Sequence, residues 1–156
     1  MTNELVRIIP GDFSDARVLA LLREHLAGMH ASSPVCSVHA LDLTGLQSPD
    51  IAFFTSWSGE ELLGCGALKQ LDSASGELKS MRTAAAHLRK GVARGLLEHL
   101  LALARARGYR RVSLETGSGP AFEPALALYR RYGFEPGERF GDYEATPFNQ
   151  FFHLAL

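Results

Sequence analysis

The pattern of hydrophobic and polar positions predicts strands that alternate with amphipathic helices along the chain. A β-branched run at residues 5–9 ends at Pro10 and predicts a first strand. The apolar positions that follow recur every three to four residues, the spacing of a buried helical stripe, at Val18, Leu22, Leu26 and Met29. Asp12 or Ser14 can cap the start of this helix.

The regular pattern stops at residues 31–49, where polar residues and two prolines predict a loop with one or two helical turns near residues 41–46. Hydrophobic runs then predict three consecutive strands, at residues 51–57, 62–71 and 77–84. The breaks between them are short and rich in Ser, Gly and Asp, as in hairpin turns. The three strands are therefore predicted to form an antiparallel meander.

The second half of the chain contains a longer helical stripe. It begins near Arg89, ends with Gly108 as the predicted C-cap, and consists of Val92, Leu96, Leu97, Leu100, Leu101 and Ala104. A strand, a second amphipathic helix and two short aromatic strands follow, at residues 112–116, 121–132, 134–140 and 148–156. These elements predict one α/β domain built on a mixed sheet.

Composition narrows the class of protein. The chain has 156 residues, enough for one domain, and its 46% hydrophobic and 21% charged residues exclude a disordered tail or a fibre. Charge interrupts every apolar run before the roughly 18 residues of a membrane-spanning helix, and the N-terminus lacks the apolar core of a signal peptide. Cytoplasmic localisation is therefore expected. Cys36 and Cys65 form no C-x-x-C motif, so a zinc finger is not expected.

The net charge of −1 conceals an uneven distribution. Residues 79–131 hold eleven basic and three acidic side chains, whereas the rest of the chain holds 5 basic and 14 acidic ones. Part of the basic excess comes from Arg105, Arg107, Arg110 and Arg111, which raises the possibility of nucleic-acid binding. A pI of about 6.6 and the lack of interleaved exposed aromatic residues argue against that partner.

The start of the longer helix has the features of a phosphate site. A helix N-terminus presents about four backbone N–H groups without intrahelical partners. Gly91 and the small Ala93 leave room for a ligand, and Arg89, Lys90 and Arg94 add positive charge. The segment matches neither the G-x-x-x-x-G-K-[ST] loop nor the G-x-G-x-x-G loop, so a P-loop NTPase and a dinucleotide-binding fold are not expected.

Two motifs resemble those of the GNAT (GCN5-related N-acetyltransferase) superfamily. LRKGVA at residues 88–93 resembles its acyl-CoA signature [Q/R]-x-x-G-x-[G/A] at Gly91 and Ala93, with Leu88 in place of Gln or Arg. ALALYRRYGF at residues 125–134 resembles its A-x-x-L-Y-x-x-x-G-F helix end. The strings SVHALDL, KSMRT, LETG and FGDY, at residues 37–43, 79–83, 114–117 and 140–143, resemble a YsnE-like bacterial branch.

The resemblance implies a single GNAT domain over residues 1–156, with α/β (α+β) architecture and a mixed, mostly antiparallel sheet of six to seven strands flanked by about four helices. It implies acetyl-CoA as co-substrate and direct acetyl transfer to the primary amine of a small-molecule or peptide acceptor, without a metal. The cofactor-binding residues it implies are Met81, Arg82 and Thr83 for the pantetheine arm, and Arg89, Lys90, Gly91, Val92, Ala93, Arg94 and Gly95 for the phosphates.

The same resemblance implies catalytic roles for two residues. Tyr129 is expected to protonate the departing thiolate, and Tyr132 to be an amphipathic core residue with its hydroxyl satisfied. Glu115 is expected to act as general base through water or to attract an ammonium group; an ion pair with Arg82 or Arg111 is the alternative. Cys65 is expected to be a core residue.

The acceptor side is implied to include His30, His39, Asp42, Asp142 and Tyr143, although each of these also suits ordinary polar loop structure. The spacing H-x8-H-x2-D matches no strong metal site. A non-catalytic acyl-CoA-binding sensor is the alternative function. Neither nucleic acid nor a membrane is an expected partner, and the aromatic strand at residues 148–152 makes a homodimer conceivable.

Overall fold

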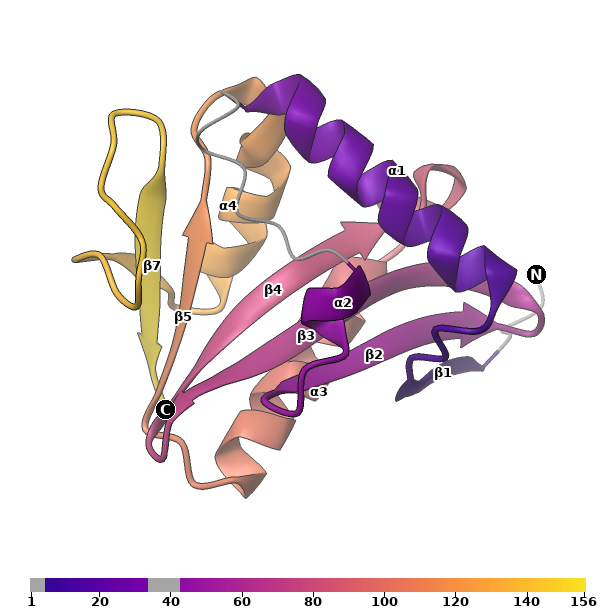
Figure 1. Ribbon diagram of the computed structural model, residues 1–156, viewed down its shortest axis with the longest axis horizontal. Helices are drawn as coiled ribbons and strands as arrows, with labels where there is room; N and C mark the ends of the chain where they lie inside the picture. Colours follow the sequence, from indigo (N-terminus) through magenta and orange to yellow (C-terminus); the bar gives the residue numbers. More distant parts are fainter. Residues whose placement is uncertain (1–4, 34–42) are drawn as a thin grey trace.

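The computed structural model describes residues 5–33 and 43–156, and within them seven strands form one sheet in the order β1-β2-β3-β4-β5-β7-β6 (Figure 1). The strands are β1 (Val6–Pro10), β2 (Ile51–Ser58), β3 (Glu61–Asp72), β4 (Ser75–Thr83), β5 (Arg111–Thr116), β6 (Glu135–Pro136) and β7 (Gln150–Ala155). Neighbouring strands are antiparallel except β4 and β5, which are parallel. The predicted mixed, mostly antiparallel sheet is therefore confirmed.

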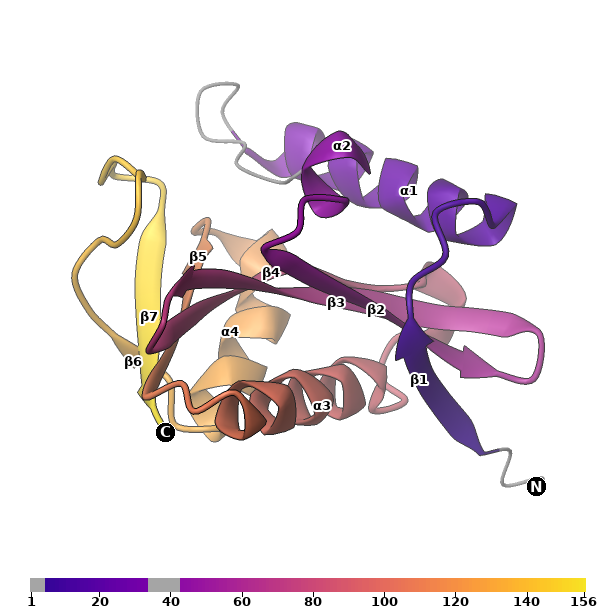
Figure 2. The ribbon, with the colours of Figure 1, turned by 60° about the horizontal axis from the view of Figure 1, so that its bottom comes forward.

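Helices cover both faces of this sheet (Figure 2). The α-helices of the described residues are α1 (Ala16–Ser32), α2 (Leu43–Leu46), α3 (Val92–Ala106) and α4 (Glu123–Arg131), and two short 3-10 turns are η2 (Ala85–His87) and η3 (Pro120–Phe122). On one face, Val18 and Leu22 of α1 pack in a cluster with Trp57 of β2. On the other, Leu97 and Leu100 of α3 are fully buried in the larger cluster. None of the described helices meets the length and hydropathy of a membrane span.

The sheet splits between its two parallel strands. β4 and β5 pair only where Ser75–Glu77 meets Arg111–Ser113. Beyond Glu77, β4 continues beside β3 while β5 continues beside β7, and Figure 1 shows the two arrows diverging. A bulge in β4 accompanies the split: three steps from Lys79 to Arg82 face two steps on β3, and Ser80 has a φ of 55°. The split leaves one backbone edge of each strand open to a ligand.

Several predicted boundaries were wrong because special backbone conformations set them. The long helix begins at Val92 rather than near Arg89, because Arg89 and Gly91 have left-handed φ values of 64° and 81°. The cap of α1 is Asp15, whose carboxylate accepts the Arg17 amide at 2.8 Å. Asp12, one of the two predicted caps, instead accepts the amide of Ser14, the other, at 2.9 Å.

The end of the chain also differs from its prediction. The aromatic strand expected at residues 134–140 is reduced to β6, whose two residues pair with His153 and Phe152. Gly108 lies one residue past the C-cap Arg107 and has a φ of 77°. β7 lies between β5 and β6, and Phe151 and Phe152 are buried within the chain. Pairing of this strand with a second copy of the chain is untested and stays a prediction.

Candidate active site

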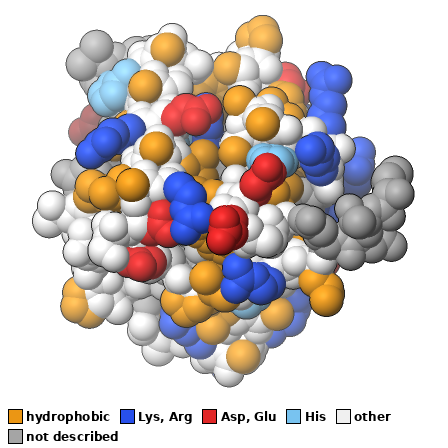
Figure 3. Space-filling view, turned by 90° about the vertical axis from the view of Figure 1, so that its right-hand side faces the viewer, with side chains coloured by type: hydrophobic (Ala, Val, Ile, Leu, Met, Phe, Trp, Pro, Cys, Tyr) orange, Lys and Arg blue, Asp and Glu red, His pale blue; other side chains and the backbone are white. Residues whose placement is uncertain are grey.

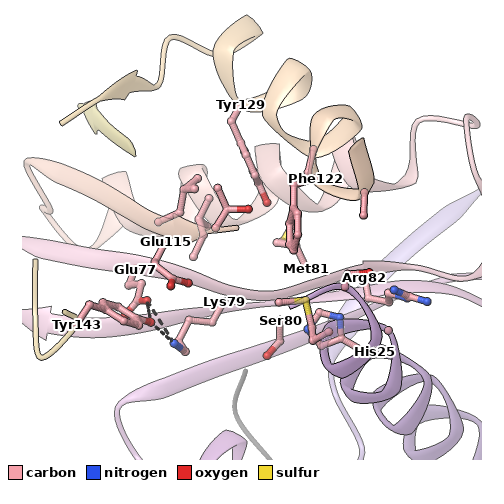
Figure 4. A pocket seen from close by; sticks show the side chains of 18 residues that line it. His25, Glu77, Lys79, Ser80, Met81, Arg82, Glu115, Phe122, Tyr129 and Tyr143 are labelled. Atoms are coloured by element: carbon pink, nitrogen blue, oxygen red, sulfur yellow. Dashed lines mark hydrogen bonds and ion pairs between the residues drawn. The ribbon is translucent and has the colours of Figure 1, made fainter. Parts of the chain in front are cut away.

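A cavity of about 220 Å³ lies where β4 and β5 separate (Figure 4). Its walls come from both splayed strands, from α1, from the η3–α4 segment and from the loop that precedes β7. Leu78 and Leu114 belong to the core cluster beneath the sheet, and Met81 packs against that cluster. Because successive strand side chains point to opposite faces, Glu77, Lys79 and Glu115 lie on the other face, toward α1. The cavity therefore has an apolar half beside α4 and a polar half beside α1.

Tyr129 reaches the apolar half from α4. Leu126 and Tyr129, three residues apart, form the buried side of this helix, and the Tyr129 ring packs edge-on against Phe134 at 5.6 Å between centroids. Figure 4 shows the hydroxyl pointing from the helix into the cavity. Burial raises the pKa of Tyr129 to about 12. The phenol is therefore protonated at neutral pH and able to donate its proton.

Glu115 reaches the polar half from β5 and is half-buried. Asn149, just before β7, donates its side-chain amide to Glu115 Oε2 at 3.3 Å. Of the two arginines weighed as ion-pair partners, Arg82 pairs instead with Glu24 of α1 at 3.4 Å. Arg111 lies four residues away at the start of β5, roughly 13 Å along an extended strand.

Glu77 and Lys79 were not expected at the site, yet they form its most buried charged pair among the described residues. Lys79 Nζ lies 3.3 Å from Glu77 Oε2, and the two side chains are 8% and 3% exposed. Tyr143 completes the network: its hydroxyl accepts from Lys79 at 2.5 Å and donates to Glu77. A glutamate and a lysine two residues apart, and so on the same face of a central strand, are the sequence signal for this pair.

His25 is a second residue that the sequence did not indicate. It is buried in α1, lines the cavity, and has no hydrogen-bond partner for Nδ1 within the described residues. Burial, and then the positive charge of Arg82, lower the pKa of His25 to about 4. Its position continues the helical stripe of Val18 and Leu22, so the sequence pattern alone suggests a core position.

The predicted phosphate cradle lies at the start of α3. Gly91 takes the left-handed N-cap position, and a Cβ there would meet nothing within 4 Å, so the cradle is open to solvent. The first intrahelical bond joins the Gly95 amide to the Gly91 carbonyl at 3.0 Å, which leaves the amides of residues 92–94 outside the helical ladder. Arg89 and Lys90 are exposed beside them. The exposed Arg94 pairs with Glu98 at 3.2 Å.

The implied pantetheine edge lies between this cradle and the cavity. Met81, Arg82 and Thr83 are the last residues of β4, beyond its pairing with β5. On their other side, Arg82 and Thr83 pair with Cys65 and Gly64 of β3. An acyl-CoA fits this arrangement, because an open strand edge leads from an amide-rich cradle to a cavity with an apolar half.

The residues expected at the acceptor side are dispersed. Tyr143 lines the cavity, and its neighbour Asp142 is exposed. His30 is exposed in the last turn of α1 and is not a lining residue. His39 and Asp42 lie outside the described residues. Within residues 5–33 and 43–156, no group of three His, Cys, Asp or Glu side chains could hold a metal ion.

Two residues expected to be structural are so placed. Cys65 is fully buried in β3, where burial raises its pKa to about 12 and its Sγ donates to the Ser80 carbonyl at 3.3 Å. Tyr132, the C-cap of α4, is half-buried, packs against the larger core cluster and donates its hydroxyl to Glu98. Neither residue belongs to the cavity.

A second cavity of about 220 Å³ lies between β1 and the start of α1. Arg17 spans it, bonding to Asp15 at 2.7 Å and to the Glu60 carbonyl at 2.7 Å and covering the Trp57 ring at 4.5 Å. Figure 3 shows acidic and basic side chains lying side by side at this end of the molecule. The opposite charges neutralise one another locally, so this cavity is a poorer site for an anionic ligand than the split in the sheet.

Known proteins share this fold and sequence pattern. The model of the acetyltransferase (GNAT) family matches residues 18–134. The chain is 52% identical over 136 residues to the uncharacterized N-acetyltransferase YsnE of Bacillus subtilis (strain 168), covering 87% of this chain and 90% of that one. It is 46% identical over 145 residues to the uncharacterized N-acetyltransferase YedL of Escherichia coli (strain K12), covering 93% and 91%.

Solved structures of other proteins have the same fold. A protein from Klebsiella pneumoniae, assigned as an acyl-CoA N-acyltransferase, superposes with a TM-score of 0.82 at 28% identity over 99% of each chain. A GNAT family acetyltransferase from Elizabethkingia anophelis with acetyl-CoA bound superposes with a TM-score of 0.72 at 16% identity, over 99% of this chain and all of the other. With its split sheet, open helix start and buried tyrosine, this chain belongs to the acetyltransferase (GNAT) family, in a YsnE-like branch, and is an acyltransferase.

Proposed function

We propose that the protein transfers an acetyl group from acetyl-CoA directly to the primary amine of a small-molecule or peptide acceptor. The observation that carries the proposal is that the end of β4, which is not paired with β5, lies between the helix start at Gly91 and a cavity lined by Tyr129. The thioester of acetyl-CoA supplies the activated acyl group.

Donor binding is assigned to backbone groups and flanking charges. The backbone edge at Met81, Arg82 and Thr83 would hold the pantetheine amides by strand-like hydrogen bonds. The amides of residues 92–94 would hold the pyrophosphate, and Arg89 and Lys90 would attract the phosphates. The side chain of Arg82 faces α1 and pairs with Glu24, so its contribution to donor binding would come from its backbone.

The chemistry is divided between the two halves of the cavity. In the polar half, Glu115 would take a proton from the acceptor ammonium, directly or through water, because only a neutral amine has the lone pair to attack. In the apolar half, Tyr129 would give its proton to the departing sulfur, because its hydroxyl points into the cavity. The proposed acid and base come from α4 and β5, and both side chains line the cavity.

Donor binding and turnover can be measured separately. Acetyl-CoA at about 100 times its Kd should stabilise the fold by ~2.7 kcal/mol in thermal unfolding. CoA release should then depend on an added primary amine from a panel of an alkylamine, an amino acid, an N-terminal peptide and a lysine peptide. Stabilisation without release would indicate an acyl-CoA sensor, and the absence of any stabilisation would contradict the proposal.

Tyr129→Phe removes the proposed acid with little change in packing. We expect kcat to fall by about 10² or more, the usual contribution of a general acid, with the acetyl-CoA Kd unchanged. Tyr132→Phe is the matched control, because it removes a hydroxyl that binds Glu98 outside the cavity. Full kcat in the Tyr129→Phe enzyme would exclude the acid role.

A further inference from the structure

The ion pair of Glu77 and Lys79 lies at the point where the sheet splits. Glu77 is the last β4 residue paired with β5, and both side chains line the cavity. A buried ion pair contributes little net stability, because desolvation offsets the attraction between the charges. Removing one member is nevertheless costly, since it leaves an uncompensated charge. The pair therefore constrains the polar half of the cavity more than it stabilises the fold.

The constraint acts on Tyr143, which lies more than sixty residues away in sequence. Its ring packs against Phe140 and Phe151, with centroid separations of 5.3 Å and 6.0 Å. Its hydroxyl contacts both members of the pair, as the dashed lines in Figure 4 mark. Ring packing and two hydrogen bonds thus fix this phenol at the cavity wall.

The directions of these hydrogen bonds determine whether the hydroxyl can donate or accept a further hydrogen bond. A phenol has one proton to donate, and here it goes to Glu77. Any other partner of the oxygen must therefore donate to it, as Lys79 does. An ammonium group supplies three such donors, whereas a carboxylate or a carbonyl supplies none.

We infer that Glu77 and Lys79 are positioning residues that hold the Tyr143 hydroxyl as a hydrogen-bond acceptor for the amine of the acceptor substrate. The inference rests on the proposed function and deepens it, because it assigns the recognition of the amine to a particular oxygen. Glu115 lines the same cavity from β5, and its carboxylate likewise only accepts hydrogen bonds. A bound amine would thus meet hydrogen-bond acceptors from both Tyr143 and Glu115.

Steady-state kinetics with the amine of highest kcat/KM from the panel test the contact. We expect Tyr143→Phe to raise the KM of that amine about tenfold or more, the effect of losing one hydrogen bond to a charged group, and to leave the KM of acetyl-CoA unchanged. Tyr132→Phe again serves as the control and should change neither KM. An unchanged amine KM in the Tyr143→Phe enzyme would overturn the inference.

The positioning role is tested with Tyr143 left in place. The double variant E77Q/K79M replaces the buried pair with neutral side chains of similar size, so it should fold. We expect it to raise the amine KM as much as Tyr143→Phe does, and the triple variant with Tyr143→Phe to raise it little further. Effects that simply add would show that the pair and the hydroxyl act independently, which contradicts the inference.

A third measurement does not depend on turnover. Lys79→Ala removes the ammonium and about a propyl chain, so propylammonium should raise the melting temperature of this variant more than that of the wild type. Tetramethylammonium, which has no N–H donor, should not. Equal shifts in both proteins would overturn the assigned network. If no amine in the panel releases CoA, the proposed function fails, and the propylammonium result still decides whether this pocket recognises N–H donors.

Discussion

His25 is a titratable side chain in a buried position. The ring is 7% exposed on the buried face of α1, and the nearby Arg82 charge adds to the effect of burial on its pKa. A pKa of about 4 keeps it neutral during catalysis, so it would shape the polar half of the cavity as a neutral wall. Protonation of this side chain is therefore coupled to unfolding.

The coupling has a definite sign. Between pH 6.5 and about 4, the unfolded chain binds the His25 proton and the folded chain does not, so stability falls as the pH falls through this window. We expect His25→Gln to remove up to about 3 kcal/mol of this acid-induced loss, measured by urea unfolding at pH 7 and pH 4. His30→Gln, on the exposed side of the same helix, is the matched control for replacing a histidine of α1. A His25→Gln protein with the wild-type slope would contradict the lowered pKa.

Helix α3 has a glycine with a left-handed φ at each end. Comparing the same substitution at the two positions therefore distinguishes an effect on ligand binding from an effect of backbone strain. Gly91 and Gly108 have φ values of 81° and 77°, and a Cβ at either would meet nothing within 4 Å. Only Gly91 belongs to the proposed phosphate cradle. The same substitution at the two positions should thus cost similar stability and have different effects on the ligand.

We expect Gly91→Ala and Gly108→Ala each to lose about 1 to 2 kcal/mol of stability, because an L-residue is strained in the left-handed region. In Gly91→Ala the new methyl group would also hold a phosphate away from the amides, so the acetyl-CoA Kd should rise about tenfold or more. Isothermal titration calorimetry measures the acetyl-CoA Kd of each variant. Equal acetyl-CoA affinities in the two variants would remove the cradle from the donor site.

The fold shows where the unevenly distributed charges of the chain lie. Two groups of the basic residues in residues 79–131 lie at the two ends of α3, with Arg89 and Lys90 before its start and Arg105 and Arg107 at its end. The two ends lie about 23 Å apart at 1.5 Å per residue. This separation exceeds the Debye length of about 8 Å at physiological salt, so only the first group acts strongly on a ligand at the cradle.

Salt dependence distinguishes the two groups. The acetyl-CoA Kd should rise as NaCl increases from 50 to 500 mM, since screening weakens the attraction of Lys90 and its neighbours for phosphates. Lys90→Gln should flatten this dependence, and Arg107→Gln should leave it as in the wild type. Identical salt slopes in all three proteins would show that charge at the helix start does not contribute to binding.

The sequence by itself determined the elements, the family and the position of the proposed phosphate cradle, because each depends on local signals. The stripe of α3, the hairpin turns and the glycine at residue 91 act within a few residues, and the two GNAT-like motifs are continuous strings. Exact boundaries were missed where the backbone takes unusual φ values, as at Arg89. The role of Tyr129 came from the family pattern and stays a prediction.

Only the tertiary structure decided what forms the polar half of the cavity. Glu77 and Lys79 meet Tyr143 because β4 separates from β5 and the loop before β7 packs beside the gap, contacts that span more than sixty residues. His25 has the helical spacing of a core residue, and only the fold shows that its ring also borders a cavity. Periodicity specifies which face of an element is buried, whereas the packing of distant elements specifies what that face meets.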